Sequence, residues 1–179
     1  MKLGLWFGLA LWLTAVFALL KIAEAAKLSP FDPTQSLIMQ SMELNFEPRL
    51  GAALKTVEAD LANKVIHIRS GECVCESLAE KHSSELSNNL AKLGFKSEAI
   101  NLDALPELAK LIPSTPAVLV FNHEQKLLYL GPYSEGLGCF TNSSLSQKII
   151  KLSQSRYFGA QINADVEGCY CANKLAVTR

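Results

Sequence analysis

The sequence has no surplus of either charge, because 17 Lys and Arg side chains balance 17 Asp and Glu side chains over 179 residues. Binding to nucleic acid or another polyanion needs a basic excess, so this balance excludes those partners. Charged residues make up only 19% and hydrophobic residues 49%, which excludes a wholly disordered chain. Internal repeats, a Gly-rich phosphate loop, and Ser-His-Asp or paired-carboxylate patterns are also missing.

A long uncharged run is present at the N-terminus. Residues 3–20 carry no charge and are flanked by two lysines. Signal-peptide cores have about 7–15 apolar residues and membrane spans about 17–25, so this run has the length of a span. We therefore expect residues 1–25 to be an uncleaved signal anchor. The alternatives are a signal peptide cleaved near Ala25, after the A-x-A-like Ala23-Glu24-Ala25, and a buried helix of a soluble protein.

The remaining length allows one ordinary domain with a modest core. Residues 26–46 contain Pro30 and Pro33 and no periodic pattern, which predicts a tether. We expect the domain over residues 47–156 and a cysteine-containing tail over residues 157–179.

Hydrophobic periodicity within the domain predicts a first helix followed by the order β-α-β-α-β-β-α. The predicted helices lie near residues 47–63, 75–93, 104–111 and 144–154, and the strands near residues 64–69, 95–102, 117–121 and 126–130. Val57 is expected on the inner face of the first helix. The inner face of the long helix is expected to carry Leu78, His82, Leu86, Leu90 and Leu93.

The five cysteines are grouped, and two of the three groups are C-x-C. They are Cys73, Cys75, Cys139, Cys169 and Cys171. In an exported chain such grouping indicates disulfide or metal chemistry. The first pair lies where a strand meets a helix, and a helix N-terminus stabilises a thiolate. We expect Cys73 to be the nucleophile and Cys75 the resolving thiol, joined in a disulfide across one intervening residue.

The element order resembles the thioredoxin fold, together with Cys73-Val74-Cys75 and Ser114-Thr115-Pro116-Ala117. The resemblance covers about residues 64–155, although thioredoxins carry C-x-x-C after an aromatic residue. It implies a cis Thr115–Pro116 bond beside the cysteines, whose backbone would hold a substrate chain. The whole looks like membrane-tethered thioredoxin-like proteins of Gram-negative bacteria with unassigned function. That likeness implies a periplasmic domain tethered to the inner membrane through residues 3–20, or a soluble periplasmic one after cleavage.

The predicted topology brings a loop and the tail into consideration. The third strand should run antiparallel to the first, so the loop at residues 131–139 should border Cys73 and Pro116. Tyr133 in that loop is a candidate for a substrate groove, and Cys139 is a candidate third thiol. The tail is long enough to return to the site. Its Cys169 and Cys171 would then be a redox relay, a clip to Cys139 or metal ligands.

The three histidines have weaker signals. His82 lies two helical turns after Cys75 and is expected to be a partly buried helix residue, with metal binding or proton transfer as the alternative. His67 is expected to be structural, and His123 to be at the surface of a hairpin turn.

These observations predict an exported thiol–disulfide oxidoreductase that acts on protein thiols or disulfides and needs no cofactor. The first alternative is a copper or zinc module built from two C-x-C arms, or from one arm and His82. The second is a non-catalytic thioredoxin-fold adaptor whose disulfides are structural.

Overall fold

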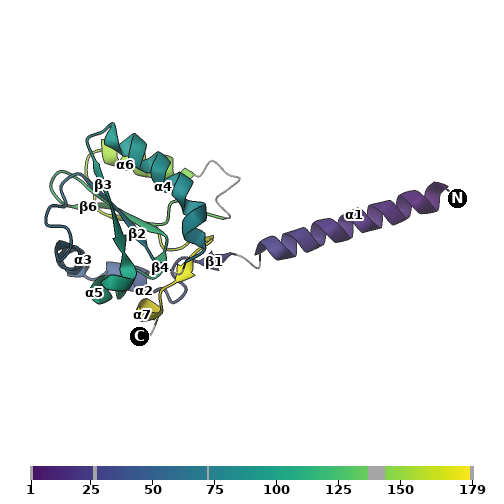
Figure 1. Ribbon diagram of the computed structural model, residues 1–179, viewed down its shortest axis with the longest axis horizontal. Coiled ribbons are helices and arrows are strands. Elements are labelled where there is room, and N and C mark those ends of the chain that lie inside the picture. The colour runs from purple at the N-terminus through teal and green to yellow at the C-terminus, as the bar shows by residue number, and fades with distance from the viewer. Residues whose placement is uncertain (1, 26–27, 72, 137–143, 178–179) are drawn as a thin grey trace.

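The computed structural model describes residues 2–25, 28–71, 73–136 and 144–177 (Figure 1). A five-stranded mixed sheet lies between helices on both of its faces, which confirms the predicted α/β class. Helix α1 (Lys2–Ala25) forms over the uncharged N-terminal run and projects away from this body.

The sheet has the strand order β3-β2-β5-β6-β7. Strand β2 (Lys64–Arg69) is parallel to β3 (Lys96–Asn101) and antiparallel to β5 (Ala117–Phe121). Strand β6 (Leu127–Gly131) is antiparallel to β5, and β7 (Gln161–Ile162) is parallel to β6. The four longer strands match those expected from the sequence. The fifth comes from the tail, which contributes to the sheet instead of lying outside it.

The two faces of the sheet bury separate apolar clusters. Helices α4 (Cys75–Ala91) and α6 (Ser144–Gln154) cover one face, where they pack with Val118 and Val120 of β5. The other face packs against α2 (Ser36–Ser41), α3 (Phe46–Lys55), the 3-10 helix η1 (Leu102–Ala104) and α5 (Pro106–Ala109). Successive strand residues point to opposite faces, so one uninterrupted apolar strand such as β5 supplies both clusters.

Two details of the predicted helices are wrong. Helix α3 ends at Lys55, so Val57 lies beyond it and is 52% exposed. Helix α4 buries Ser83, Leu86 and Leu90, whereas Leu78 is 43% exposed. Turns of 3.6 residues explain the second error, because steps of four residues rotate steadily away from one face.

The segment before α3 is packed, contrary to the expected tether. Phe31 is fully buried and meets the ring of Tyr170 edge-on, with the ring centroids 5.2 Å apart. The buried Asp32 carboxylate accepts the backbone N–H groups of Ser36, Leu37 and Ile38 at 2.8–3.1 Å and so begins α2. One aromatic side chain and one capping carboxylate therefore fix a segment that has no periodic pattern.

The tail after α6 runs back across the body in short extended pieces. Strand β8 (Glu167–Gly168) pairs with β1 (Ser29–Pro30), and β9 (Cys171–Ala172) pairs with β4 (Ser114–Thr115). Helix α7 (Lys174–Val177) follows. The tail therefore does return to the cysteine region, as its length allowed.

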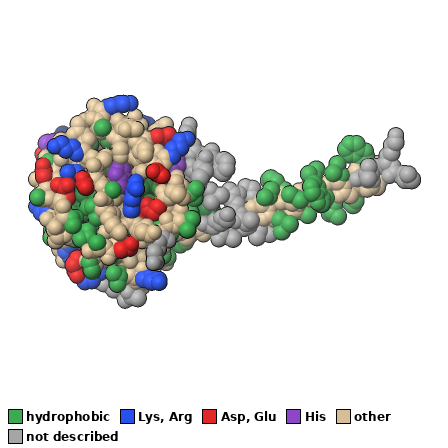
Figure 2. Space-filling view, viewed as in Figure 1, with side chains coloured by type: hydrophobic (Ala, Val, Ile, Leu, Met, Phe, Trp, Pro, Cys, Tyr) green, Lys and Arg blue, Asp and Glu red, His purple; other side chains and the backbone are tan. Residues whose placement is uncertain are grey.

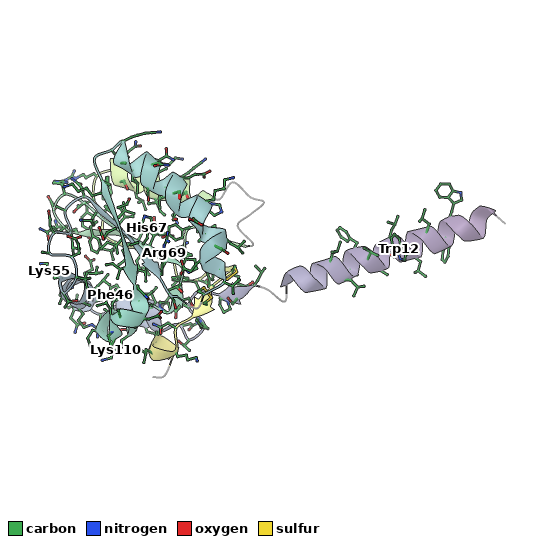
Figure 3. The ribbon with its side chains drawn as sticks, in the orientation of Figure 1. Trp12, Phe46, Lys55, His67, Arg69 and Lys110 are labelled. Atoms are coloured by element: carbon green, nitrogen blue, oxygen red, sulfur yellow. A yellow bond between two sulfur atoms is a disulfide. The ribbon has the colours of Figure 1, made fainter. Side chains whose placement is uncertain are left out.

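The surface agrees with the balanced composition. On the face shown in Figure 2, basic and acidic side chains of the body are interspersed, and apolar side chains line α1. Trp6, Phe7, Trp12 and Phe17 on α1 are all exposed. Figure 3 shows Trp12 on this helix, away from the body. Among the residues that the structure describes, no helix has the length and apolarity needed to cross a membrane. The location of the protein stays a prediction.

Candidate functional site

Four of the five cysteines meet where β2 leads into α4, and they form two disulfides. Cys73 is bonded to Cys171 and Cys75 to Cys169, with Cα–Cα distances of 5.7 Å and 5.5 Å. Cys139 lies outside the described residues. The disulfide expected between Cys73 and Cys75 is therefore wrong for this state, because each of these cysteines pairs with the tail.

The cross-pairing follows from the local chain geometry. Cys73 and Cys75 are one residue apart, so their bonds to Cys171 and Cys169 show that the two tail cysteines turn their sulfur atoms to the same side. The intervening Tyr170 points the other way and is buried. Val74, between the other two cysteines, is 82% exposed, so Cys73 and Cys75 both turn toward the body.

Backbone pairing delivers the tail to this position. Cys171 lies opposite Thr115 in the register of β4 and β9. Just beyond, the Asn173 N–H donates to Pro113 O at 2.7 Å, and its side-chain amide donates to the carbonyl oxygens of Ala109 and Ile112 at 2.6 Å and 3.1 Å. Asn173 had no signal in the sequence, since a lone Asn in a tail is common.

The Thr115–Pro116 peptide bond is cis and lies beside the Cys73–Cys171 disulfide. Cys73 Sγ is 3.6 Å from Thr115 O. A disulfide sulfur has no proton to donate, so in this state the approach is a contact, and only the reduced thiol would donate a hydrogen bond there. The two motifs that carried the resemblance are thus brought together, as expected.

A shallow depression lies over the Cys75–Cys169 disulfide. Cys75, Cys169, Pro116 and His82 line it, together with Leu78, Ala79, Tyr133, Ser134, Gly136 and Tyr170. Its volume of about 20 Å³ has room for one or two water molecules and not for a small-molecule ligand. A substrate would therefore reach this disulfide as a protruding side chain or chain segment. The loop after β6 borders the cysteines through Tyr133, Ser134 and Gly136, as the predicted topology required.

Tyr133, one of the residues that line this depression, is buried. Its hydroxyl donates to Ala117 O at 3.2 Å and lies 2.6 Å from His67 Nδ1, while His67 Nε2 lies 2.8 Å from Ser87 Oγ. Burial raises the pKa of Tyr133 above its ordinary range. The hydroxyl thus faces inward and joins β2, α4 and the loop. The sequence predicts Tyr133 at a substrate groove; the structure places Tyr133 in the lining of the depression, while its hydroxyl bonds to groups inside the body.

Among the described residues, the carboxylate of Glu76 follows directly after Cys75. Glu76 is half-buried, and desolvation raises its pKa against the smaller opposing effects of the Ser70 N–H, Arg69 and Thr115. The Ser70 N–H donates to Glu76 Oε1 at 3.1 Å. This hydrogen bond ties the first turn of α4 to the residue that follows β2.

The histidines are placed as expected. His67 is buried inside the body (Figure 3), His82 is partly buried on α4, and His123 is exposed in the turn before β6. In the described part of the chain, one group of three or more potential metal ligands is found, formed by Cys73, Cys75 and Cys171.

Comparison with known proteins gives a family match. No curated protein and no solved structure matches the sequence. A family model matches residues 42–173, well over half of the chain, and this range includes all four paired cysteines, the cis-proline and Asn173. The protein therefore belongs to the family described as "Domain of unknown function (DUF6436)".

Proposed function

We propose that the protein is a thiol–disulfide oxidoreductase with a thioredoxin-like fold, and that Cys75–Cys169 is the disulfide that reacts first. The fold proposal is supported by the order β3-β2-β5-β6, by α4 as the parallel crossover, and by the cis-proline beside the cysteines. The observation that carries the function is the position of Cys75–Cys169 in the wall of a surface depression next to Pro116.

The chemistry follows from which sulfur is accessible and which thiolate is stabilised. Cys169 is the partly exposed partner, and Cys75 is the buried one at the first turn of the 17-residue helix α4. A substrate thiolate attacks Cys169 Sγ, the S–S bond to Cys75 breaks, and Cys75 leaves as a thiolate near unpaired backbone N–H groups. This assigns Cys75, and not Cys73, as the first thiolate formed.

The second step completes the exchange. The second thiolate of the substrate attacks the substrate's first sulfur, which is bonded to Cys169 in the mixed disulfide. The bond to Cys169 breaks, and Cys169 leaves as a thiolate. Two electrons and two protons have then moved from a substrate dithiol to Cys75 and Cys169. The substrate gains one disulfide. The reverse sequence reduces a substrate disulfide when the protein is in its dithiol form.

The presence of a second disulfide argues against a purely structural role. Cys73–Cys171 closes a loop with a sequence separation of 98, for which the chain-entropy relation gives about 4.7 kcal/mol of stabilisation. Once it is formed, Cys75–Cys169 closes a ring of only about six residues, worth about 2 kcal/mol by the same relation. Either bond alone provides most of this stabilisation, so one of the two can open without releasing the tail.

The proposal requires an oxidising compartment, because disulfides of this kind are reduced in the cytosol. Export was expected from the N-terminal sequence, and the two disulfides support it.

The test is to mix the oxidised full-length protein with a reduced dithiol peptide, quench with an alkylating reagent and map the alkylated cysteines. We expect the peptide to become oxidised, with Cys75 and Cys169 alkylated before Cys73 and Cys171. The variant Cys73→Ala/Cys171→Ala should keep this reaction, and its matched control Cys75→Ala/Cys169→Ala should lose it. If excess dithiol leaves all four cysteines oxidised, the disulfides are structural and the adaptor alternative is favoured.

A further inference from the structure

The four paired cysteines are also arranged as a possible ligand set for a metal ion. The Sγ atoms of Cys73, Cys75 and Cys171 all lie within 4.8 Å of one another. Cys169, bonded to Cys75, places a fourth sulfur atom beside this group. The ligands come as two C-x-C arms from two segments almost one hundred residues apart in the sequence.

These separations suit a tetrahedral thiolate site. A Zn–S bond of about 2.3 Å places the sulfur atoms of a tetrahedral site roughly 3.8 Å apart. Sulfur atoms that already lie within 4.8 Å need only small side-chain rotations to reach that spacing. When a disulfide is reduced, its two sulfur atoms separate to van der Waals distance, which is in the same range.

The fold holds the two arms together without the disulfides. The pairing of β9 with β4 and the three hydrogen bonds of Asn173 fix the chain immediately after Cys171. Between the two tail cysteines, Tyr170 is buried against Phe31, and its hydroxyl donates to Ser134 O. The Gly136 N–H donates to Glu167 O at 2.7 Å just before Cys169. The reduced thiols would therefore remain close together.

The burial of these cysteines favours binding of a cation by the reduced site. Cys73 and Cys75 are buried, and Cys169 and Cys171 are partly buried. Ionising four such thiols without a counter-charge is costly, whereas a thiophilic divalent cation compensates the thiolates and displaces their protons.

We propose that the reduced protein binds one thiophilic cation of the zinc type through Cys73, Cys75, Cys169 and Cys171, so that oxidation of these cysteines excludes the metal. Two equivalents of an external dithiol supply the four electrons that open the two disulfides. The metal then replaces the thiol protons. This site does not depend on the proposed exchange activity, since chemical reduction alone would create it.

The experiment uses the full-length protein carrying Cys139→Ala, which removes the fifth thiol from the assay. The protein is reduced with a phosphine, freed of reductant without air, and titrated with Zn²⁺ against a chromophoric chelator. Co²⁺ serves as the spectroscopic probe and Mg²⁺ as the control cation. We expect one Zn²⁺ per chain, sulfur-to-cobalt charge-transfer bands with tetrahedral d–d bands, and no binding by the oxidised protein.

Variants identify the ligands. Each of Cys73→Ala, Cys75→Ala, Cys169→Ala and Cys171→Ala should weaken Zn²⁺ binding about 100-fold or more, the share of one ligand in a structural zinc site. His82→Ala, the matched control on the rim of the depression, should leave Zn²⁺ affinity and the Co²⁺ spectrum unchanged. If His82→Ala weakens Zn²⁺ binding and Cys171→Ala does not, the assignment of the ligands is overturned.

Circular dichroism of the same samples covers the case in which the reduced protein unfolds. Refolding on addition of Zn²⁺ supports the site, because metal binding and folding are then coupled. An unfolded reduced protein that Zn²⁺ does not restore contradicts it, as does a folded one without stoichiometric binding. A protein that oxidises the dithiol peptide but fails these tests retains the proposed function and loses the metal site.

Discussion

The imidazole of His67 and the phenol of Tyr133 lie 2.6 Å apart from Nδ1 to hydroxyl and stack with their planes 15° apart, although 66 residues separate them in sequence. Because the Tyr133 hydroxyl donates to Ala117 O, it accepts from His67 Nδ1–H, and Nε2 is left to accept from Ser87 Oγ. Both ring nitrogens are thus used by a neutral imidazole. Burial, and to a smaller degree Arg69, lowers the pKa of His67 to about 4.

This arrangement predicts a pH dependence of stability. Above the unfolded pKa of 6.5, His67 is neutral in both states and has no effect. Between pH 6.5 and about pH 4 the unfolded chain binds a proton that the folded protein does not. The free energy of unfolding therefore decreases as the pH is lowered through this range, by up to about 3 kcal/mol. Urea denaturation at neutral pH and at about pH 4.5 should show this loss of stability in the native protein and a smaller loss in His67→Gln. An equal loss in both proteins would contradict the assignment.

Removal of the disulfides should be strongly non-additive. Cys75→Ala/Cys169→Ala leaves the loop of separation 98 closed and should lower the free energy of unfolding by about 2 kcal/mol. Cys73→Ala/Cys171→Ala should cost a similar amount, because the loop of separation 94 then remains closed. Changing all four cysteines should cost roughly 7 kcal/mol relative to the native protein, measured by denaturant titration. Equal costs for each successive removal would show that the two bonds do not restrain the same loop.

Gly168 marks the closest approach in the tail. A Cβ atom at this residue would lie 2.6 Å from the Tyr170 ring and 3.0 Å from Gly136 O. Gly168→Ala should therefore displace the tail and lower the free energy of unfolding by about 1–3 kcal/mol. The control is Gly51→Ala in α3, where a Cβ meets nothing within 4 Å and helix propensity should raise stability by roughly 0.5–1 kcal/mol. Thermal melts of both variants give the comparison, and equal melting temperatures would refute the close contact.

Asp32 should matter more than its place in a non-periodic segment suggests. Asp32→Ala leaves three N–H groups of α2 without their acceptor and should cost about 2 kcal/mol in a denaturant titration. Asp32→Asn, which keeps one acceptor oxygen, should cost less. The exposed Asp60, whose Oδ1 accepts the local Ala62 N–H, provides the control, and Asp60→Ala should change stability by less than about 0.5 kcal/mol. A loss as small as this in Asp32→Ala would mean that the segment is not held by this carboxylate.

The elements with a strong pattern were predictable from the sequence. Strand β5 is an uninterrupted apolar run, β2 is rich in β-branched residues, and α6 has the bounds expected from its periodicity. Helix α4 was found, but its inner face was rotated: Leu78 and Leu86 are eight residues apart, which is about 80° more than two full turns. Leu86 is therefore buried and Leu78 exposed.

The cysteine pairing was not predictable, for a physical reason. It depends on where the tail lies, and the tail is held by two-residue strands, Tyr170 and the hydrogen bonds of Asn173, none of which has a periodic signature. The proline beside the cysteines was predictable because its motif is local. The network of His67 and Tyr133 joins distant residues and leaves no trace in either local sequence.

The pairing of β1 with β8 has a mechanical consequence. Ser29 lies opposite Gly168, the residue that precedes Cys169, and Phe31 N–H donates to Val166 O at 2.8 Å. A pulling force on helix α1 would therefore reach the body through β1 and its pairing with β8, which ends one residue before Cys169. Whatever α1 attaches to would therefore restrain the stretch of tail that leads into Cys169.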